Sequence, residues 1–493
     1  MTIIGKLHTL ARLINANANK KSQNIHNLTA NLTIYEDPNN AGRSLRLTHI
    51  GSCIQSSLTI TQQDIANEVA DEKNKSGNQA LTLVNKANAS NRDMDAIPLN
   101  AINFADTALK LVGGSNDASS SDVDRVDEQS EVRPSYALGS FGSGTIHIGQ
   151  YAGHVTIEQG NRKARLNEYT GAMSTAKGSC ISSSGHQGTL KHIPIASFTI
   201  EEDQLASLKQ AISYRNKLAT STSEEGDWIY MQCRSLDSRR DNASFTPPSS
   251  TNGYMAGNTI QLIGFDGRSV MIHNTAISTE GSNIRKAPNA FRVELKTFSD
   301  MIGAYDTDIR ISIGENSIQI SDHQLEGLPR QASGTLTLTA PISDAEGKAN
   351  AKMDMIEKLW TEKRVSWETG ELGDNIHNVI KVADIGELAN AAIFASAMCD
   401  NRGDGIYIQI EKDNGEYIDI EGVSTDGGNN KTRLNVRVMN PQPIRKCIAP
   451  IAITNLKIWK DASASINIGK SEKDKVAVRI GETRLIIMPM HIQ

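Results

Sequence analysis

The side chains of this chain that could do chemistry do not stand at the spacings that catalysis needs. The glycine-rich run GSFGSGTIHIG (139–149) could hold a phosphate group, but it has no lysine and leads into a predicted strand rather than a helix. SSSGH (182–186) places serine beside histidine, and the carboxylates of ENSIQISDH (315–323) fall on a predicted hairpin. A polar loop and a solvated strand face explain these two better than an active site does. The Walker-type phosphate loop, HExxH and GxSxG are absent. We therefore expect no catalytic residue, and a protein that is not an enzyme.

The thiols and imidazoles give no metal site either. The chain has five cysteines, at Cys53, Cys180, Cys233, Cys399 and Cys447, and no two of them form a CxxC pair. The eleven histidines also lack the spacing of metal ligands. An odd, scattered set of cysteines is typical of a reducing compartment. We expect no metal, no cofactor and a cytoplasmic protein.

Composition narrows the class of protein further. The 493 residues predict about three domains. Lysine and arginine number 51 against 56 aspartates and glutamates, which gives a net charge of −5. This balance disfavours a DNA-binding protein that reads the grooves, but it allows contact with DNA through one restricted basic face. There is no apolar run long enough to span a membrane, and the N-terminus does not read as a signal peptide.

The elements that must position any site occur in a repeated order of helix, strands, short helix and strands. The helices are predicted from apolar residues three and four apart, and the strands from alternation. In the order of the chain, helices are expected at 6–19, 99–112, 203–219, 296–305, 384–399 and 454–461. Strands or hairpins are expected at 28–36, 45–60, 145–159, 228–236, 258–274, 308–322, 405–424, 432–439 and 464–492.

This order predicts an α+β fold of three repeated domains, each with two helices packed on antiparallel sheets. The expected boundaries are 1–190 with polar insertions at 61–96 and 113–135, then 191–345, then 346–493, which begins with a linker to about 378. Asp203 is the expected N-cap of the 203–219 helix. The alternative is an irregular α+β protein whose elements alternate by chance.

Two segments resemble one family. TRLIIMPMHI (483–492) resembles the last strand of the bacterial β sliding clamp, the processivity factor of DNA polymerase, and IQLIGFDGRSVMI (260–272) resembles its strand–turn–strand with an Asp-Gly turn. Phe265 replaces a threonine, Arg268 a histidine and Ser269 an arginine of the family pattern. The resemblance covers 195–493 well and 1–190 only as a pattern of elements. It indicates a divergent clamp, with a large phage as the expected source.

The resemblance implies a head-to-tail homodimeric ring that encircles duplex DNA without reading its sequence and tethers the replicative polymerase. The polymerase and the clamp loader would bind by short linear motifs in a pocket between the second and third domains. The DNA-facing residues that it implies are Arg12, Lys20, Lys110, Lys209, Lys217, Lys296, Lys457 and Lys460. The pocket residues that it implies are Gly267, Arg268, Val270, Met488, Pro489 and Met490.

Two other functions stay open at this point. A β-rich phage virion protein would also be rich in Ser, Thr, Asn and Gly and poor in aromatic residues, although it would not need amphipathic helices at regular intervals. A clamp-like regulator that does not encircle DNA would share the fold and lack the ring.

Overall fold

The computed structural model describes the ordered elements of the chain and the turns between many of them. The described residues are 3–17, 29–36, 42–51, 53–66, 81–85, 96–112, 146–159, 162–169, 190, 192–218, 227–234, 259–265, 269–283, 290–322, 334–343, 347, 349, 351–352, 354–355, 371–372, 375–376, 378–399, 405–411, 415–424, 428–469 and 474–490. They form two compact units. Unit 1 comprises residues 1–190 and 324–339, and unit 2 comprises 191–323 and 340–493.

The described residues of unit 1 include the helices α1 and α3 and a short helical segment at 62–66. Its strands pair in the order β17-β3-β2-β1-β5 and, in a second sheet, in the order β4-β6-β7-β8. All pairings are antiparallel except that of β4 with β6. The elements are α1 (Ile3–Asn17), β1 (Thr29–Glu36), β2 (Arg43–Ile50), β3 (Gln55–Ile60), β4 (Leu81–Asn85), β5 (Ile97–Asn100), α3 (Ala101–Val112), β6 (Ile146–Tyr151), β7 (His154–Gln159), β8 (Arg162–Asn167) and β17 (Thr335–Pro341), which belongs to unit 1 up to Thr339.

Unit 2 contains a continuous nine-stranded sheet of order β14-β10-β11-β12-β28-β27-β26-β20-β24. Its other main sheets have the orders β13-β9-β15-β16 and β23-β22-β21-β25. The first part of the unit contains β9 (Pro194–Ile200), α4 (Glu202–Leu218), β10 (Trp228–Arg234), β11 (Thr259–Phe265), β12 (Ser269–Ala276), β13 (Ser278–Asn283), β14 (Phe291–Glu294), α5 (Leu295–Gly303), β15 (Ile309–Gly314) and β16 (Ser317–Asp322). The second part contains β18 (Glu371–Leu372), β19 (Asn375–Ile376), β20 (Asn378–Val382), α7 (Ile385–Ser396), β21 (Gly405–Ile410), β22 (Tyr417–Val423), β23 (Asn429–Asn435), β24 (Arg437–Met439), β25 (Ile444–Ile448), α8 (Pro450–Thr454), the 3₁₀ helix η4 (Asn455–Trp459), β26 (Ala464–Ile468), β27 (Val476–Ile480) and β28 (Thr483–Ile487).

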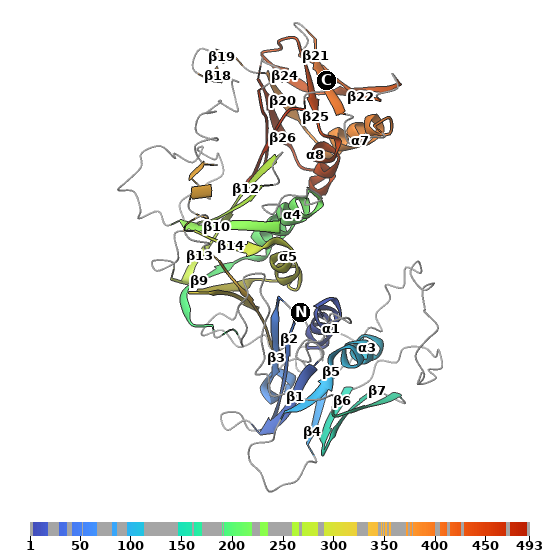
Figure 1. Cartoon of the computed structure of the whole chain (residues 1–493), viewed down its shortest axis with the longest axis vertical. Coiled ribbons are helices and arrows are strands. Elements are labelled where there is room, and N and C mark those ends of the chain that lie inside the picture. Colours follow the sequence, from blue (N-terminus) through green and yellow to red (C-terminus); the bar gives the residue numbers. More distant parts are fainter. Residues whose placement is uncertain are drawn as a thin grey trace. The chain divides into compact units, whose positions relative to one another are not determined.

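The helices contact each other in pairs and cover the sheets. In unit 1, α1 contacts α3. In unit 2, α5 contacts α4, α4 contacts η4, and η4 contacts α7, so these helices follow one another along one side of the sheets (Figure 1). Each helix buries an apolar stripe: Leu205, Leu208 and Ile212 of α4 are at most 1% exposed. This spacing is that of one helical face, so the opposite face of each helix is left to the solvent.

The α+β prediction is confirmed, and the six helices expected from the sequence are present. The largest change is in the predicted insertion 61–96, where residues 81–85 form β4 and pair with β6. The expected insertion at 113–135 lies outside the described residues. The division into three domains stays a prediction.

The prediction that Asp203 is the N-cap of the 203–219 helix is wrong. Helix α4 begins at Glu202, one residue earlier, and the carboxylate of Asp308 accepts a hydrogen bond from the Glu202 backbone N–H at 2.8 Å. A carboxylate that precedes β15 therefore satisfies the first turn of α4.

Among the described residues, no helix has the length and apolarity needed to cross a membrane. In the same part of the chain, no group of three or more His, Cys, Asp and Glu side chains could hold a metal ion.

Candidate functional site

The basic residues predicted to face DNA lie on the outer faces of the helices in most cases. Arg12 on α1 and Lys110 on α3 are exposed in unit 1. In unit 2 the exposed members are Lys217 on α4, Lys296 on α5, Lys457 on η4 and Lys460, which follows η4. Lys20 lies outside the described residues. The exposed lysines of unit 2 that are predicted to face DNA thus lie on, or directly after, the contiguous row of helices α5, α4 and η4.

Lys209 has a different environment from the other predicted DNA-facing residues. Its ammonium group donates to the backbone carbonyl of Tyr305 and to the Asp306 carboxylate, the latter at 3.0 Å, and its side chain is 28% exposed. It therefore ties α4 to the end of α5. The first turn of α4 also carries Glu202 and Asp203, and no lysine or arginine stands on α7. The helical surface of unit 2 is weakly basic rather than uniformly so.

The residues predicted for the partner pocket come from two strands that pair directly. β12 and β28 are antiparallel neighbours, and Val270 lies opposite Ile486. Two residues further on, Met488, Pro489 and Met490 are half-buried, and the Met490 N–H donates to the Cys447 carbonyl of β25 at 3.0 Å. The C-terminal segment therefore leaves the nine-stranded sheet and joins the edge of the sheet that contains β25. Gly267 and Arg268 lie outside the described residues.

An apolar cluster covers this face of the nine-stranded sheet. Its buried members include Val270, Ile486 and Ala349, and Ala349 comes from the segment that precedes β18. Trp228 and Phe265 are partly buried at its border. Each of these two rings has a cation above it: the Arg292 guanidinium lies 4.1 Å from the Trp228 ring centroid, and the Lys352 ammonium 4.3 Å from that of Phe265. This arrangement provides apolar contact area with positive charge at its rim.

A buried arginine connects helix α4 to the strand that leads into the Asp-Gly segment. Arg215 is 1% exposed, and its guanidinium donates to the Phe265 carbonyl at 2.7 Å. Its alkyl chain crosses Gly264, where a Cβ atom would lie 2.5 Å from Cδ of Arg215. The sequence pattern directs this arginine to the apolar side of the helix, and the structure confirms that it is not on the outer face.

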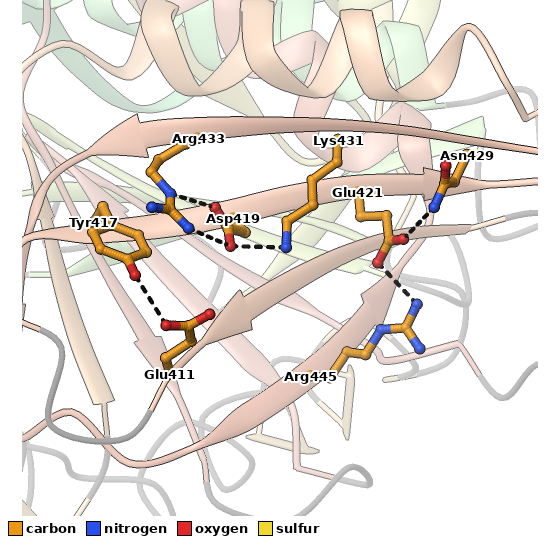
Figure 2. A network of polar contacts seen from close by, with 8 residues as sticks. All are labelled: Glu411, Tyr417, Asp419, Glu421, Asn429, Lys431, Arg433 and Arg445. Carbon is orange, nitrogen blue, oxygen red and sulfur yellow. Dashed lines mark hydrogen bonds and ion pairs between the residues drawn. The ribbon is translucent and has the colours of Figure 1, made fainter.

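Strand β23 forms one edge of its sheet in unit 2, and a network of charged side chains holds it there. Asp419 on β22 is 1% exposed and accepts from Arg433 at 2.9 and 3.2 Å and from Lys431 at 2.9 Å (Figure 2). Hydrogen bonds from both basic residues lower the pKa of Asp419. Beside it, Glu421 accepts from Arg445 and Asn429, each at 3.0 Å. These contacts fasten β23, an edge strand of its sheet, to β22, and Glu421 also links β22 to β25.

The fold as a whole matches solved structures over its full length. The chain is similar to the DNA polymerase sliding clamp of Bacillus subtilis, with a TM-score of 0.58, 11% identity and coverage of 99% of this chain and 98% of that one. It is similar to the β subunit of DNA polymerase III from Thermotoga maritima, with a TM-score of 0.57, 10% identity and coverage of 100% and 99%. The chain has the sliding-clamp fold. A Helicobacter pylori β clamp bound to a DNA ligase peptide also matches, with a TM-score of 0.54, 10% identity and coverage of 98% and 97%. No protein-family model and no curated protein matches the sequence.

This sliding-clamp fold contains a short sequence repeat that motifs and hydrophobic periodicity do not reveal. The edge strand β8 of unit 1 contains KARLN (163–167), and the edge strand β23 of unit 2 contains KTRLN (431–435). The two strands have the same register, because Lys163 lies opposite Glu158 and Lys431 opposite Glu421. The signal that identifies both strands is the self-similarity of the two pentapeptides, which is present in the sequence alone.

A buried histidine links β12 to β28 in this clamp fold, and it predicts a dependence of stability on pH. Nδ1 of His273 lies 2.9 Å from the Thr483 hydroxyl, and complete burial lowers the pKa of His273 to about 4. An unfolded histidine has a pKa of about 6.5, so the unfolded state binds the proton first as the pH falls. The contribution of His273 to the free energy of unfolding is complete above about pH 6.5. It decreases as the pH falls toward the pKa of His273 in the folded state, by about 2 kcal/mol between pH 7.5 and 5.

We expect His273→Asn to remove most of this decrease in stability between pH 7.5 and 5. The measurement is urea unfolding at both pH values, followed by tryptophan fluorescence; all four tryptophans belong to unit 2. An equal loss of stability in the variant and in the original protein would contradict the assignment.

Proposed function

We propose that this protein is a DNA sliding clamp, which encircles duplex DNA and tethers the replicative DNA polymerase during processive synthesis. The observation that carries the proposal is the match to sliding clamps over 98–100% of this chain and 97–99% of theirs. A clamp acts by topological enclosure rather than catalysis, which agrees with a chain in which we expect no catalytic residue. Its place of action would be the cytoplasm that contains the replicating DNA.

The helical surfaces support the DNA-facing role. Lys217, Lys296 and Lys457 are exposed on neighbouring helices, whereas the apolar faces of these helices cover the sheets. Phosphate contacts of this kind attract DNA without reading its sequence. A weakly basic surface suits a ring that must slide, since each strong phosphate contact would slow its movement.

The two edge strands support closure into a ring of two copies. β8 lies beside α3 in unit 1, and β23 lies beside α7 in unit 2. On α7, Ile393 and Phe394 are 39% and 53% exposed, and the Asn430 side chain of β23 donates to the Phe394 carbonyl at 3.2 Å. An open strand edge next to exposed apolar side chains is typical of a subunit interface. Pairing of β8 with β23 of a second copy would be head-to-tail and would close after two copies.

The partner site is proposed on the face of the nine-stranded sheet around Phe265 and Met488. The Helicobacter pylori clamp with a DNA ligase peptide supports a peptide as the kind of ligand. Methionine side chains adapt to different apolar partners, which suits a site that receives several motifs. The polymerase and the clamp loader would be the main partners.

A topological assay tests the ring. Linear duplex DNA with biotin at both ends is incubated with the protein, the ends are then blocked with streptavidin, and the complex is washed in about 0.5 M NaCl to screen ionic contacts. We expect retention of the protein only when the ends are blocked, and its release when a restriction enzyme cuts the DNA. Light scattering should give a mass of twice 53.5 kDa.

The interface variant is Phe394→Asp, with Ile193→Asp as the matched control. Ile193 is 59% exposed and belongs to unit 2, where it directly precedes β9 and is far in sequence from β23. We expect Phe394→Asp to be monomeric and not retained, and Ile193→Asp to behave as the original protein. A monomeric original protein, or retention that ignores the DNA ends, would exclude the ring and favour a clamp-like regulator that does not encircle DNA.

A further inference from the structure

One row of residues crosses the nine-stranded sheet of unit 2 from edge to edge. Direct antiparallel partners lie on the same face, so the pairings of successive strands define a row. Starting at β24, the partners are Arg437, Lys381, Ser465, Arg479, Arg484, Ile272, Ile263, Tyr230 and Arg292. The row contains five basic residues and no acidic one.

The basic residues are concentrated in one half of the row. We call Arg437, Lys381, Arg479 and Arg484 the basic row. Arg437 is exposed, Lys381 and Arg479 are half-buried, and Arg484 is buried. Lys381 donates to the Ser465 hydroxyl at 2.9 Å. Burial and the charge of Arg479 lower the pKa of Arg484 to about 10, against the opposing effect of Glu482.

The other half of the row is apolar up to Arg292 at its far end, and it borders the proposed partner site. Ile272, Ile263 and Tyr230 belong to the same buried cluster as Val270 and Ile486. The basic row therefore begins where the apolar cluster ends, at the junction of β12 and β28. Four strand spacings separate Arg437 from Arg484, which is about 19 Å, the length of about six residues of an extended peptide.

We propose that the basic row binds an acidic flank of a partner peptide whose apolar residues bind beside Phe265 and Met488. The inference rests on the proposed function, and it adds the charge of the motif that the site selects. Charge complementarity carries it: four cations on neighbouring strands attract carboxylates spaced along an extended chain. The protein as a whole carries a net charge of −5, so this attraction is local to the row.

A peptide fits this surface better than a nucleic acid does. The cations continue directly into apolar side chains, and a peptide offers both carboxylates and apolar anchors in one chain. A nucleic acid would need phosphate contacts along its whole length. Duplex DNA is therefore included in the test as a competitor.

The test uses fluorescein-labelled peptides with an apolar core of Ala-Leu-Met-Leu-Phe. One peptide carries four glutamates before the core and another carries them after it, and each has a twin with glutamines. Binding to the full-length protein is measured by fluorescence anisotropy at low and high salt. We expect one glutamate peptide to bind about tenfold more tightly than its twin at low salt, with the difference reduced at high salt.

The double variant Arg437→Gln/Arg479→Gln should abolish this preference and leave binding of the glutamine peptide unchanged. The matched control is Arg43→Gln/Arg46→Gln on β2 of unit 1, which changes the net charge equally. Three results would overturn this inference but not the proposed function. They are a preference that persists in the double variant, equal binding of the glutamate and glutamine peptides, and displacement of the glutamate peptide from the basic row by duplex DNA. If no peptide binds, the partner site of the proposed function fails as well.

Discussion

Replacement of Arg215 by alanine is expected to lower the free energy of unfolding of unit 2 by about 3 kcal/mol. The guanidinium is buried, donates to the Phe265 carbonyl at 2.7 Å, and lies over Gly264. Alanine would leave a cavity between α4 and the sheet and would remove the donor from a buried carbonyl. The loss should also loosen the strand end that leads into the Asp-Gly segment.

Urea unfolding followed by tryptophan fluorescence measures this effect, because all four tryptophans belong to unit 2. Gln210→Ala is the matched control, since Gln210 is exposed on the same helix and should change stability by no more than about 0.5 kcal/mol. An unchanged midpoint for Arg215→Ala would mean that the buried guanidinium contributes nothing net to the fold.

Gly422→Ala is expected to have an effect of similar size, about 3 kcal/mol, through overpacking. Gly422 lies on β22 beneath helix α7, and a Cβ atom there would stand 1.9 Å from the Ala395 carbonyl oxygen. The obstacle is helix backbone, so it cannot turn aside as a side chain could. Either α7 or β22 must shift, and both support the edge strand β23.

The same unfolding assay applies, with Gly303→Ala as the control. A Cβ atom at Gly303, in the last turn of α5, meets nothing within 4 Å. We expect this control to keep or slightly raise the stability, since alanine favours a helix more than glycine does. A Gly422→Ala protein as stable as the original would show that α7 can move away from β22 at little cost.

Most helices could be predicted because one apolar stripe determines each of them. The helix expected at 203–219 is α4 (Glu202–Leu218), and the one expected at 384–399 is α7 (Ile385–Ser396). Their ends depend on contacts that the local sequence does not contain. Asp308, which caps the first turn of α4, stands more than a hundred residues further along the chain. Asp384 caps α7 from the adjacent position, accepting from the Gly386 N–H at 2.7 Å, and this cap is readable from the sequence.

The parts that escaped prediction are those fixed by tertiary contacts. β4 is only five residues long and follows a polar segment, and its pairing partner β6 is more than sixty residues away. Its alternation alone is too short to distinguish it from a loop. The last helix begins at Pro450 rather than near 454, because proline is well suited to the first helical position. Residues 455–459 continue this helix as a 3₁₀ helix.

The resemblance names two segments for the candidate partner site, and their role as a site stays a prediction. Val270 and the Met-Pro-Met segment come from strands that prove to be neighbours. Arg484 and Arg479 could not be grouped from the sequence, because a row across a sheet depends on the register of every strand between its ends. Lys209 shows the converse: its spacing places it on the helix face that is predicted to face DNA, but a helical wheel does not show its contact with Asp306.

The cationic edge strands have a consequence for assembly. Lys163 and Arg165 on β8, and Lys431 and Arg433 on β23, place two basic side chains on each open edge, and three of the four are paired with a carboxylate of the neighbouring strand. Such edges repel unrelated strands, which protects the free protein from edge-to-edge aggregation. In the proposed ring the same charges would face each other across the junction and weaken it. A weak junction is what a ring around DNA requires, because circular DNA can enter only when one junction opens and closes again.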